Sequence, residues 1–128
     1  MFSHVHVGSN DPARSKRFYD AVMAVLGGGE GVKDPERDRY FYNHDGAMLI
    51  VGKPLDGGEA TVSNGATIGF RVDSPEQGDA WVKAGIENGG TLIEDAPGIR
   101  KKTAGTLYLA YLRDPDGNKL CALKFMDR

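Results

Sequence analysis

Two histidines near the start of the chain, His4 and His6, stand two residues apart in the stretch MFSHVHVGSN. Side chains alternate between the two faces of a strand, so both imidazoles are expected on one face. Imidazole binds metal ions and transfers protons near neutral pH. The pair is therefore a candidate for metal ligation or for acid–base catalysis. A third interpretation is that both rings line a pocket and make only hydrogen bonds.

Cys121 is the only cysteine, which excludes an internal disulfide and a CxxC metal knuckle. As a thiolate it could join His4 and His6 around a zinc ion. As a thiol it is expected to be a small buried group, since reactivity requires a neighbour that lowers its pKa. Arg71 falls on the polar face of its predicted strand. It could bind a ligand carboxylate or phosphate, or pair with an acid at the rim.

Two further groups are candidates on the same grounds. Tyr108 and Tyr111 fall on opposite faces of one predicted strand, so only one can line a pocket, and we take Tyr108 as that residue. Arg100, Lys101 and Lys102 form a basic cluster in the stretch APGIRKKTAG, which we expect to be a loop. That loop is either a solvated surface or a lid that attracts an anionic ligand.

Two helices would position these residues. Asp11 is a helix N-cap followed by Pro12, and apolar residues recur at helical spacing up to the glycines at 27–29, which predicts a helix over 11–26. Ser74 and Gln77 form a capping box that opens a second helix over 74–88.

An internal repeat contains both helices. HVHVGSNDPARSKRFYDA, from His4, aligns without gaps on TIGFRVDSPEQGDAWVKA, from Thr67. HDGAMLIV, from His44, aligns on PDGNKLCAL, from Pro115, and Asp-Gly between apolar runs is a hairpin signal. Each half therefore predicts a strand, a helix and three strands.

The predicted strands lie at 2–8, 29–33, 38–44 and 47–53 in the first half, and at 66–72, 91–95, 105–113 and 119–125 in the second. We expect one α+β domain over 1–128. It would hold a first βαβββ module at 1–53, a linker at 54–65 and a second module at 66–128, since one half alone would be marginally stable.

Charge and composition narrow the class of partner. The net charge of −2 gives no electrostatic basis for binding nucleic acid or an anionic membrane. No apolar run approaches the roughly 20 residues that cross a bilayer, and no secretion signal is visible. We expect a cytoplasmic protein whose partner is a small molecule.

The duplicated order, the opening HVHVGSNDPARSKRFYDAVMAVLG and the ending YLRDPDGNKLCAL resemble the vicinal oxygen chelate superfamily over essentially the whole chain. That superfamily includes glyoxalase I, bleomycin resistance proteins and extradiol dioxygenases. The resemblance implies a cupped, eight-stranded mixed sheet with the helices on its outer face. It also implies a homodimer in which both chains build the site.

Metalloenzymes of the superfamily carry ligands at four equivalent positions, which the resemblance places at His4, Ile50, Thr67 and Cys121. Only His4 is a ligand of the expected type, and the carboxylates that serve the glyoxalase reaction are missing. The resemblance therefore implies no standard metal site. His4 and Cys121 would be the ligands of any divalent metal that does bind.

Two functions follow from these residues. The first is a metal-independent protein of the bleomycin-resistance kind that binds a small polar or anionic molecule in the cup. The second is a glyoxalase-like lyase, isomerase or dioxygenase, with His4 or His6 as acid or base and a non-standard metal on His4, His6 and Cys121. Residues expected to contact the ligand are His4, His6, Ile50, Thr67, Arg71, Tyr108 and Cys121.

Overall fold

Eight strands and two helices make up the computed structural model, which describes residues 1–128. Their order is β1 (His4–Gly8), α1 (Pro12–Val25), β2 (Val32–Lys33), β3 (Arg39–His44), β4 (Ala47–Gly52), β5 (Ile68–Arg71), α2 (Pro75–Glu87), β6 (Thr91–Lys102), β7 (Gly105–Arg113) and β8 (Lys119–Phe125). The chain is thus an α+β protein with two tandem βαβββ modules. Neither helix is long and apolar enough to cross a membrane.

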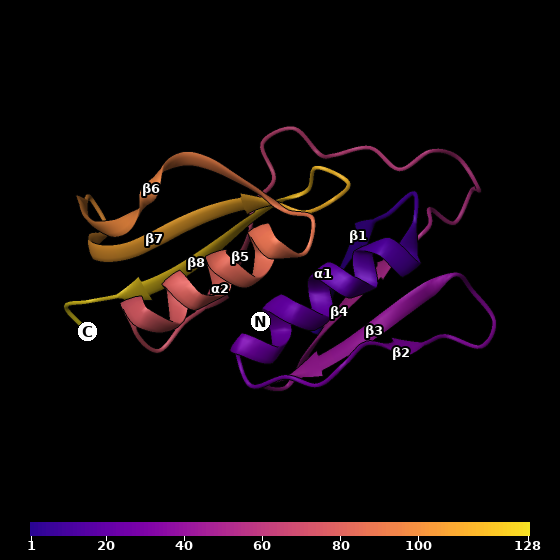
Figure 1. Ribbon diagram of the computed structural model, residues 1–128, viewed down its shortest axis with the longest axis horizontal. Helices are drawn as coiled ribbons and strands as arrows, with labels where there is room; N and C mark the ends of the chain where they lie inside the picture. Colours follow the sequence, from indigo (N-terminus) through magenta and orange to yellow (C-terminus); the bar gives the residue numbers. More distant parts are fainter.

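The strands form two four-stranded mixed sheets with the same topology, β1-β4-β3-β2 and β5-β8-β7-β6. In each sheet the first strand of the module runs parallel to the last, and the other pairs are antiparallel. The predicted eight strands are therefore present, but they are divided between two sheets instead of forming one continuous ladder (Figure 1).

Both helices begin as the sequence predicts. The Asp11 carboxylate accepts a hydrogen bond from the Arg14 amide at 3.2 Å, and proline follows the cap. The Ser74 hydroxyl accepts from the Gln77 amide at 3.1 Å, while the Gln77 side chain accepts from the Asp73 amide at 2.5 Å. The Arg14 and Gln77 amides belong to the first turn, which leaves such groups without a helical partner, whereas the Asp73 amide precedes the cap.

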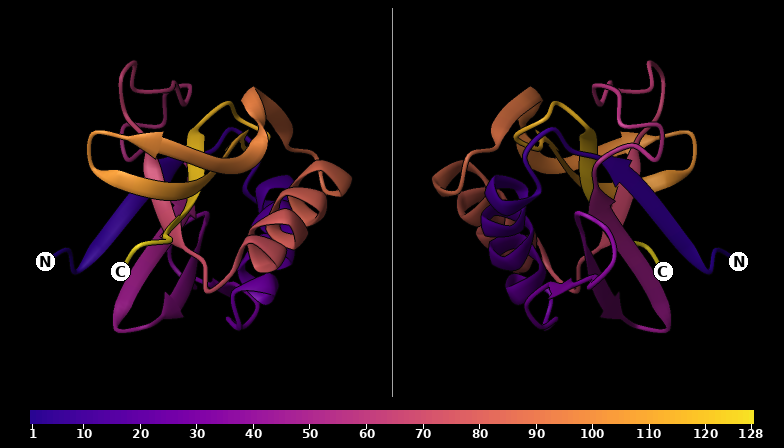
Figure 2. Two further views of the ribbon diagram at one scale, coloured as in Figure 1. Left: turned by 90° about the vertical axis from the view of Figure 1, so that its left-hand side faces the viewer. Right: turned by 90° about the vertical axis from the view of Figure 1, so that its right-hand side faces the viewer.

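The two modules share one core. α1 packs against α2, and the two helices lie side by side on the same side of both sheets (Figures 1 and 2). Sixteen buried side chains from both modules form a single apolar cluster, which includes Phe18 of α1, Trp81 of α2 and Leu112 of β7. The opposite face of each sheet is left free of helices.

The third strand of the second module differs from the prediction. We predicted a strand near 91–95 followed by a loop, whereas β6 continues to Lys102 and pairs with β7 along most of its length. A β-bulge between Ile93 and Gly98 interrupts the pairing. Arg100, Lys101 and Lys102 thus lie on a strand and not in a flexible lid, because their backbone pairs with β7.

Candidate functional site

The helix-free face of the first sheet carries the two histidines. His4 and His6 register with Met48 and Ile50 of β4, and residues paired in this way share a face. Both histidines are exposed, whereas Ile50 is buried. The predicted common face for His4, His6 and Ile50 is therefore present, and the residue beside Ile50 is His6.

His6 is the more perturbed of the two imidazoles. Its pKa lies below the usual value because nearby protein atoms desolvate the ring and because Arg37, Arg39 and His4 oppose a positive charge there. The ring is therefore neutral near pH 7 and can accept a proton. His4 instead shares a hydrogen bond of 2.8 Å between its Nδ1 and the Ser3 hydroxyl.

The helix-free face of the second sheet carries Arg71 and Cys121. Arg71 registers with Leu123 of β8, while Gly69 and Tyr111 both register with Cys121. A small apolar cluster, separate from the shared core, covers this face; its buried members are Leu107, Leu109 and Cys121, and its half-buried members are Tyr111, Leu123 and Phe125. The second sheet thus offers an apolar floor with a cation at one end.

Cys121 is a poor ligand and a poor nucleophile in this setting. Burial raises the pKa of its thiol, so the neutral form dominates near pH 7. The sulfur also lies 3.5 Å from the Ala122 carbonyl oxygen, to which it can donate. The residue contributes apolar surface to the floor instead of charge.

Tyr108 was predicted to line the pocket, but it lies on the face of β7 that the helices cover. It belongs to the helix-side core, is 1% exposed, and donates a hydrogen bond of 2.8 Å to the Asp79 carboxylate on α2. No ligand on the open face can reach it. Tyr111 takes its place there, since it registers with Cys121.

Thr67 lies just before β5 and is exposed. It lines a hollow of about 220 Å³ together with the linker residues Ser63 and Asn64 and with Arg113 and Lys119. The charged residues of this lining are Arg113 and Lys119, both cations.

The donor set does not fit a metal within one chain. No three His, Cys, Asp or Glu side chains lie close enough together to hold a metal ion. His4 and His6 belong to the first sheet and Cys121 to the second, so the non-standard site of these three residues is not assembled in one chain. The thiol is also held in its protonated form, which is not the ligand form.

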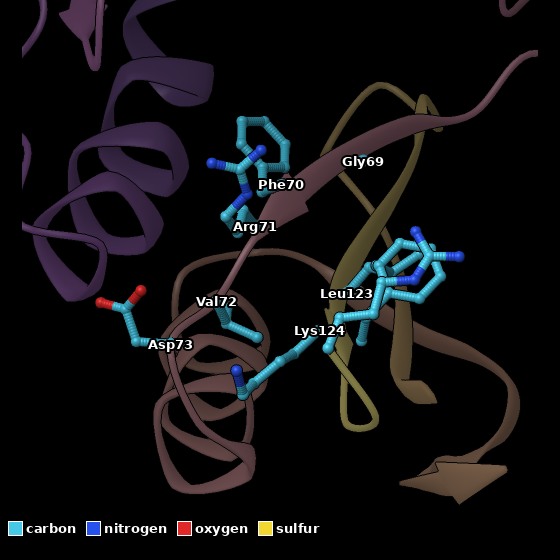
Figure 3. Close-up of a pocket in the computed structure, with 9 residues that line it drawn as sticks. Gly69, Phe70, Arg71, Val72, Asp73, Leu123 and Lys124 are labelled. Atoms are coloured by element: carbon cyan, nitrogen blue, oxygen red, sulfur yellow. The ribbon is translucent and has the colours of Figure 1, made fainter. Parts of the chain in front are cut away.

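A hollow of about 410 Å³ lies at the end of β5 and β8 (Figure 3). Nine residues line it: Gly69, Phe70, Arg71, Val72, Asp73, Leu123, Lys124, Phe125 and Arg128. The lining combines apolar surface with three cations and one acid.

Two of the three cations of this hollow are unpaired, and the third, Arg128, donates a hydrogen bond to the Ala104 carbonyl oxygen at 3.4 Å. Arg71 and Lys124 form no ion pair and donate no hydrogen bond within the chain, and Arg71 is exposed. The Arg128 guanidinium lies 4.0 Å from the centroid of the Phe125 ring. The alternative in which Arg71 pairs with an acid at the rim is therefore not observed.

Two residues of this face escaped the sequence analysis. Lys119 of β8 forms an ion pair with Glu94 of β6, and its ammonium lies 4.8 Å from the centroid of the Tyr111 ring. Alternation along β8 from Cys121 would have placed Lys119 on this face. No sequence signal marks Glu94, because its position depends on the bulge.

Comparisons with known proteins agree with this architecture. Residues 1–122 match the model of the glyoxalase/bleomycin resistance protein/dioxygenase superfamily. The chain is similar to a glyoxalase/bleomycin resistance protein from Albidiferax ferrireducens T118, with 54% identity and a TM-score of 0.92 over 96% of this chain and 98% of that one. A search of proteins with curated descriptions found no match.

More distant structures share the fold alone. A lactoylglutathione lyase from Agrobacterium tumefaciens is 19% identical, with a TM-score of 0.65 over 96% of this chain and 92% of that one. A family enzyme from Burkholderia phytofirmans PsJN is 21% identical, with a TM-score of 0.70 over 94% of this chain and 95% of that one. At this level of identity the fold is shared by proteins of many activities.

Proposed function

Since the chain belongs to the glyoxalase/bleomycin resistance protein/dioxygenase superfamily, we propose that it binds a small anionic molecule with an apolar body. The molecule lies on the open face of the second sheet and is held by side chains alone, without the standard metal site. The family hosts both binders and enzymes, so the choice between them rests on the residues of this site.

One observation supports this function above the others: Arg71 has no counter-ion and stands at the edge of an apolar hollow of about 410 Å³. A guanidinium presents a planar fork of N–H donors that matches a carboxylate or phosphate. The apolar body of the ligand would contact Leu123 and Phe125, which belong to the apolar cluster of the open face. Such a mixture of apolar wall and few polar groups is typical of small-molecule sites.

We further propose that the protein acts as a homodimer in the cytoplasm. The polar face with His4 and His6 and the apolar face with Cys121 belong to different sheets of one chain, and each is free of helices. A second copy could cover either face, and C2 dimers are the commonest oligomers. A single cysteine suits a reducing compartment. Light scattering after gel filtration measures the oligomeric state.

Thermal unfolding with a matched ligand pair tests the binding function. We expect 2-naphthoate to raise the melting temperature and the neutral 2-naphthamide to raise it less, because only the acid can bind the guanidinium. At a concentration of 100 times Kd the ligand stabilises the fold by about 2.7 kcal/mol. R71Q should weaken naphthoate binding by about tenfold.

Lys83→Gln is the matched control variant, because it removes one positive charge from the exposed side of α2, away from the hollow. Equal naphthoate binding by R71Q and K83Q would refute the role of Arg71. Equal stabilisation by naphthoate and naphthamide would refute recognition of an anion.

The second candidate is a glyoxalase-like lyase or isomerase that uses His6 as the base. Its support is the neutral state of His6 on an open face. An assay of the conversion of methylglyoxal and glutathione tests it, with H6N as the variant. A wild-type rate above that of buffer, lost in H6N, supports catalysis by His6. A wild-type rate equal to that of buffer refutes catalysis.

A further inference from the structure

The bulge in β6 places one carboxylate where regular strand geometry would not. Ile93 registers with Tyr111 and so shares the open face, which would direct Glu94 toward the helix side. Glu94 instead has a φ of 61°, in the left-handed region that glutamate rarely adopts. Its carboxylate pairs with Lys119, on the open face of β8. Bulges near binding sites commonly redirect a side chain in this way.

A dedicated contact holds the bulge in shape. The Arg100 guanidinium donates hydrogen bonds to the carbonyl oxygens of Asp95 and Ala96, at 3.1 and 2.7 Å. These two residues form no ladder pair with β7, so Arg100 satisfies carbonyls that the sheet leaves free. The backbone beside Glu94 is therefore held by specific hydrogen bonds and is not a frayed strand end.

Lys119 and Arg71 mark the two ends of one surface. Arg71 registers with Leu123, which is four residues from Lys119 on the same face of β8. At about 3.3 Å per residue, the two cationic positions are separated by about 13 Å along the strand. Cys121 and Tyr111 lie between them and form the apolar floor.

Space for an acid group also exists at the Lys119 end. The hollow of about 220 Å³ beside Lys119 is lined by Ser63, Thr67 and Arg113, which offer hydroxyl and guanidinium donors. Glu94 is the carboxylate paired with Lys119, and its side chain is 45% exposed. It can therefore swing into solvent when another anion arrives.

We propose that this surface recognises elongated molecules with two acid groups, one bound by Arg71 and the other by Lys119 in place of Glu94. This inference rests on the proposed function and extends it to the ligand class. Glu94 is an internal counter-ion: it neutralises Lys119 in the free protein and competes with the second acid group of the ligand. Molecules with a single acid group leave the Glu94–Lys119 pair intact.

Calorimetric titration with naphthalene-2,6-dicarboxylate and 2-naphthoate tests the inference on the full chain. Wild type should bind the diacid more tightly than the monoacid. E94Q should strengthen diacid binding by about three- to fivefold and leave monoacid binding unchanged, since an exposed ion pair contributes little. K119Q should abolish the preference for the diacid, while K119R should keep it because the charge remains.

The outcomes separate the two proposals. If both naphthoates bind through Arg71 but E94Q and K119Q leave the diacid preference unchanged, the proposed function stands and the role of Lys119 and Glu94 is refuted. If neither acid binds wild type, the proposed function fails and the diacid inference fails with it. Circular dichroism melting curves of each variant verify that it is folded.

Discussion

Replacement of Tyr19 by phenylalanine tests a buried polar contact between the two modules. Tyr19 lies on α1 of the first module and is fully buried, and its hydroxyl donates to Asp114 between β7 and β8 at 2.5 Å. Asp114 is 4% exposed and also accepts from the Asn118 amide group and from two backbone N–H groups, each at 2.9 Å. The substitution removes one of these donors and changes no other contact of the ring.

The cost follows from the burial and charge of the acceptor. A hydrogen bond to a charged group contributes about 1.5–3 kcal/mol, so Y19F should lower the free energy of unfolding by about 2 kcal/mol. For a chain of this size, that loss lowers the melting temperature by about 6–10 °C. Tyr42→Phe is the control: its hydroxyl donates at 2.7 Å to Asp20, a carboxylate 21% exposed, so water can replace the lost donor. We expect Y42F to cost about 1 kcal/mol or less.

The destabilisation caused by Y19F should depend on pH in a predictable direction, because Asp114 titrates. Burial raises the pKa of Asp114 in the folded state, and the hydrogen bonds from Tyr19 and Asn118 oppose that rise. The stability that the protonated carboxyl contributes is complete below the unfolded pKa and is lost as the pH rises through the folded value. Removal of the Tyr19 donor raises the folded pKa further. The difference between wild type and Y19F should therefore be largest at neutral pH and shrink as acid protonates Asp114.

Urea unfolding of wild type, Y19F and Y42F, followed by circular dichroism from neutral to acid pH, measures these differences. A Y19F cost no larger than that of Y42F would show that the fully buried contact contributes no more than a partly exposed one. A Y19F cost that stays constant with pH would show that Asp114 is not the ionised acceptor.

Three further predictions concern packing and ionisation. Gly78→Ala should lower the free energy of unfolding, measured in urea, by about 1–3 kcal/mol, because a Cβ there would overlap the buried Tyr108 ring. Gly69→Ala is the control and should cost almost nothing, because its Cβ would meet no atom within 4 Å. Equal costs for the two variants would contradict this packing. Cys121 should react with a disulfide reagent at pH 8 at least about 100-fold more slowly in the native protein than in urea; equal rates would mean that the thiol is accessible. Titration by NMR should give His6 a pKa below the ordinary histidine value, because nearby protein atoms partly desolvate the ring and because Arg37 and Arg39 oppose its positive charge. A raised pKa would contradict this charge arrangement.

Local patterns were sufficient for the elements that depend on neighbouring residues. The caps Asp11 and Ser74 each bind an amide three positions ahead, so local sequence determines where each helix begins. The repeat between the halves predicted the order of strands and helices, because each module is one local unit. The prediction of a loop at the basic stretch of β6 is wrong, because that stretch pairs with β7.

The face assignment on β7 shows why other features required the structure. Leu107, Leu109 and Tyr111 alternate with Tyr108, Ala110 and Leu112, so both faces of the strand are apolar. Alternation separates two such sets but does not say which one meets the helices. The packing of α2 decides which face is covered, since Asp79 of α2 accepts a hydrogen bond from the Tyr108 hydroxyl.

The sequence by itself determined the two-module α+β fold, the helix caps and the common face of His4 and His6, because each depends on residue type and short spacing. The tertiary structure alone decided which cations remain unpaired and how Glu94 reaches Lys119. Ion pairs form between strands that are distant in sequence, and a bulge reverses the alternation on which sequence patterns depend. The candidate site is therefore a property of register and packing more than of any motif.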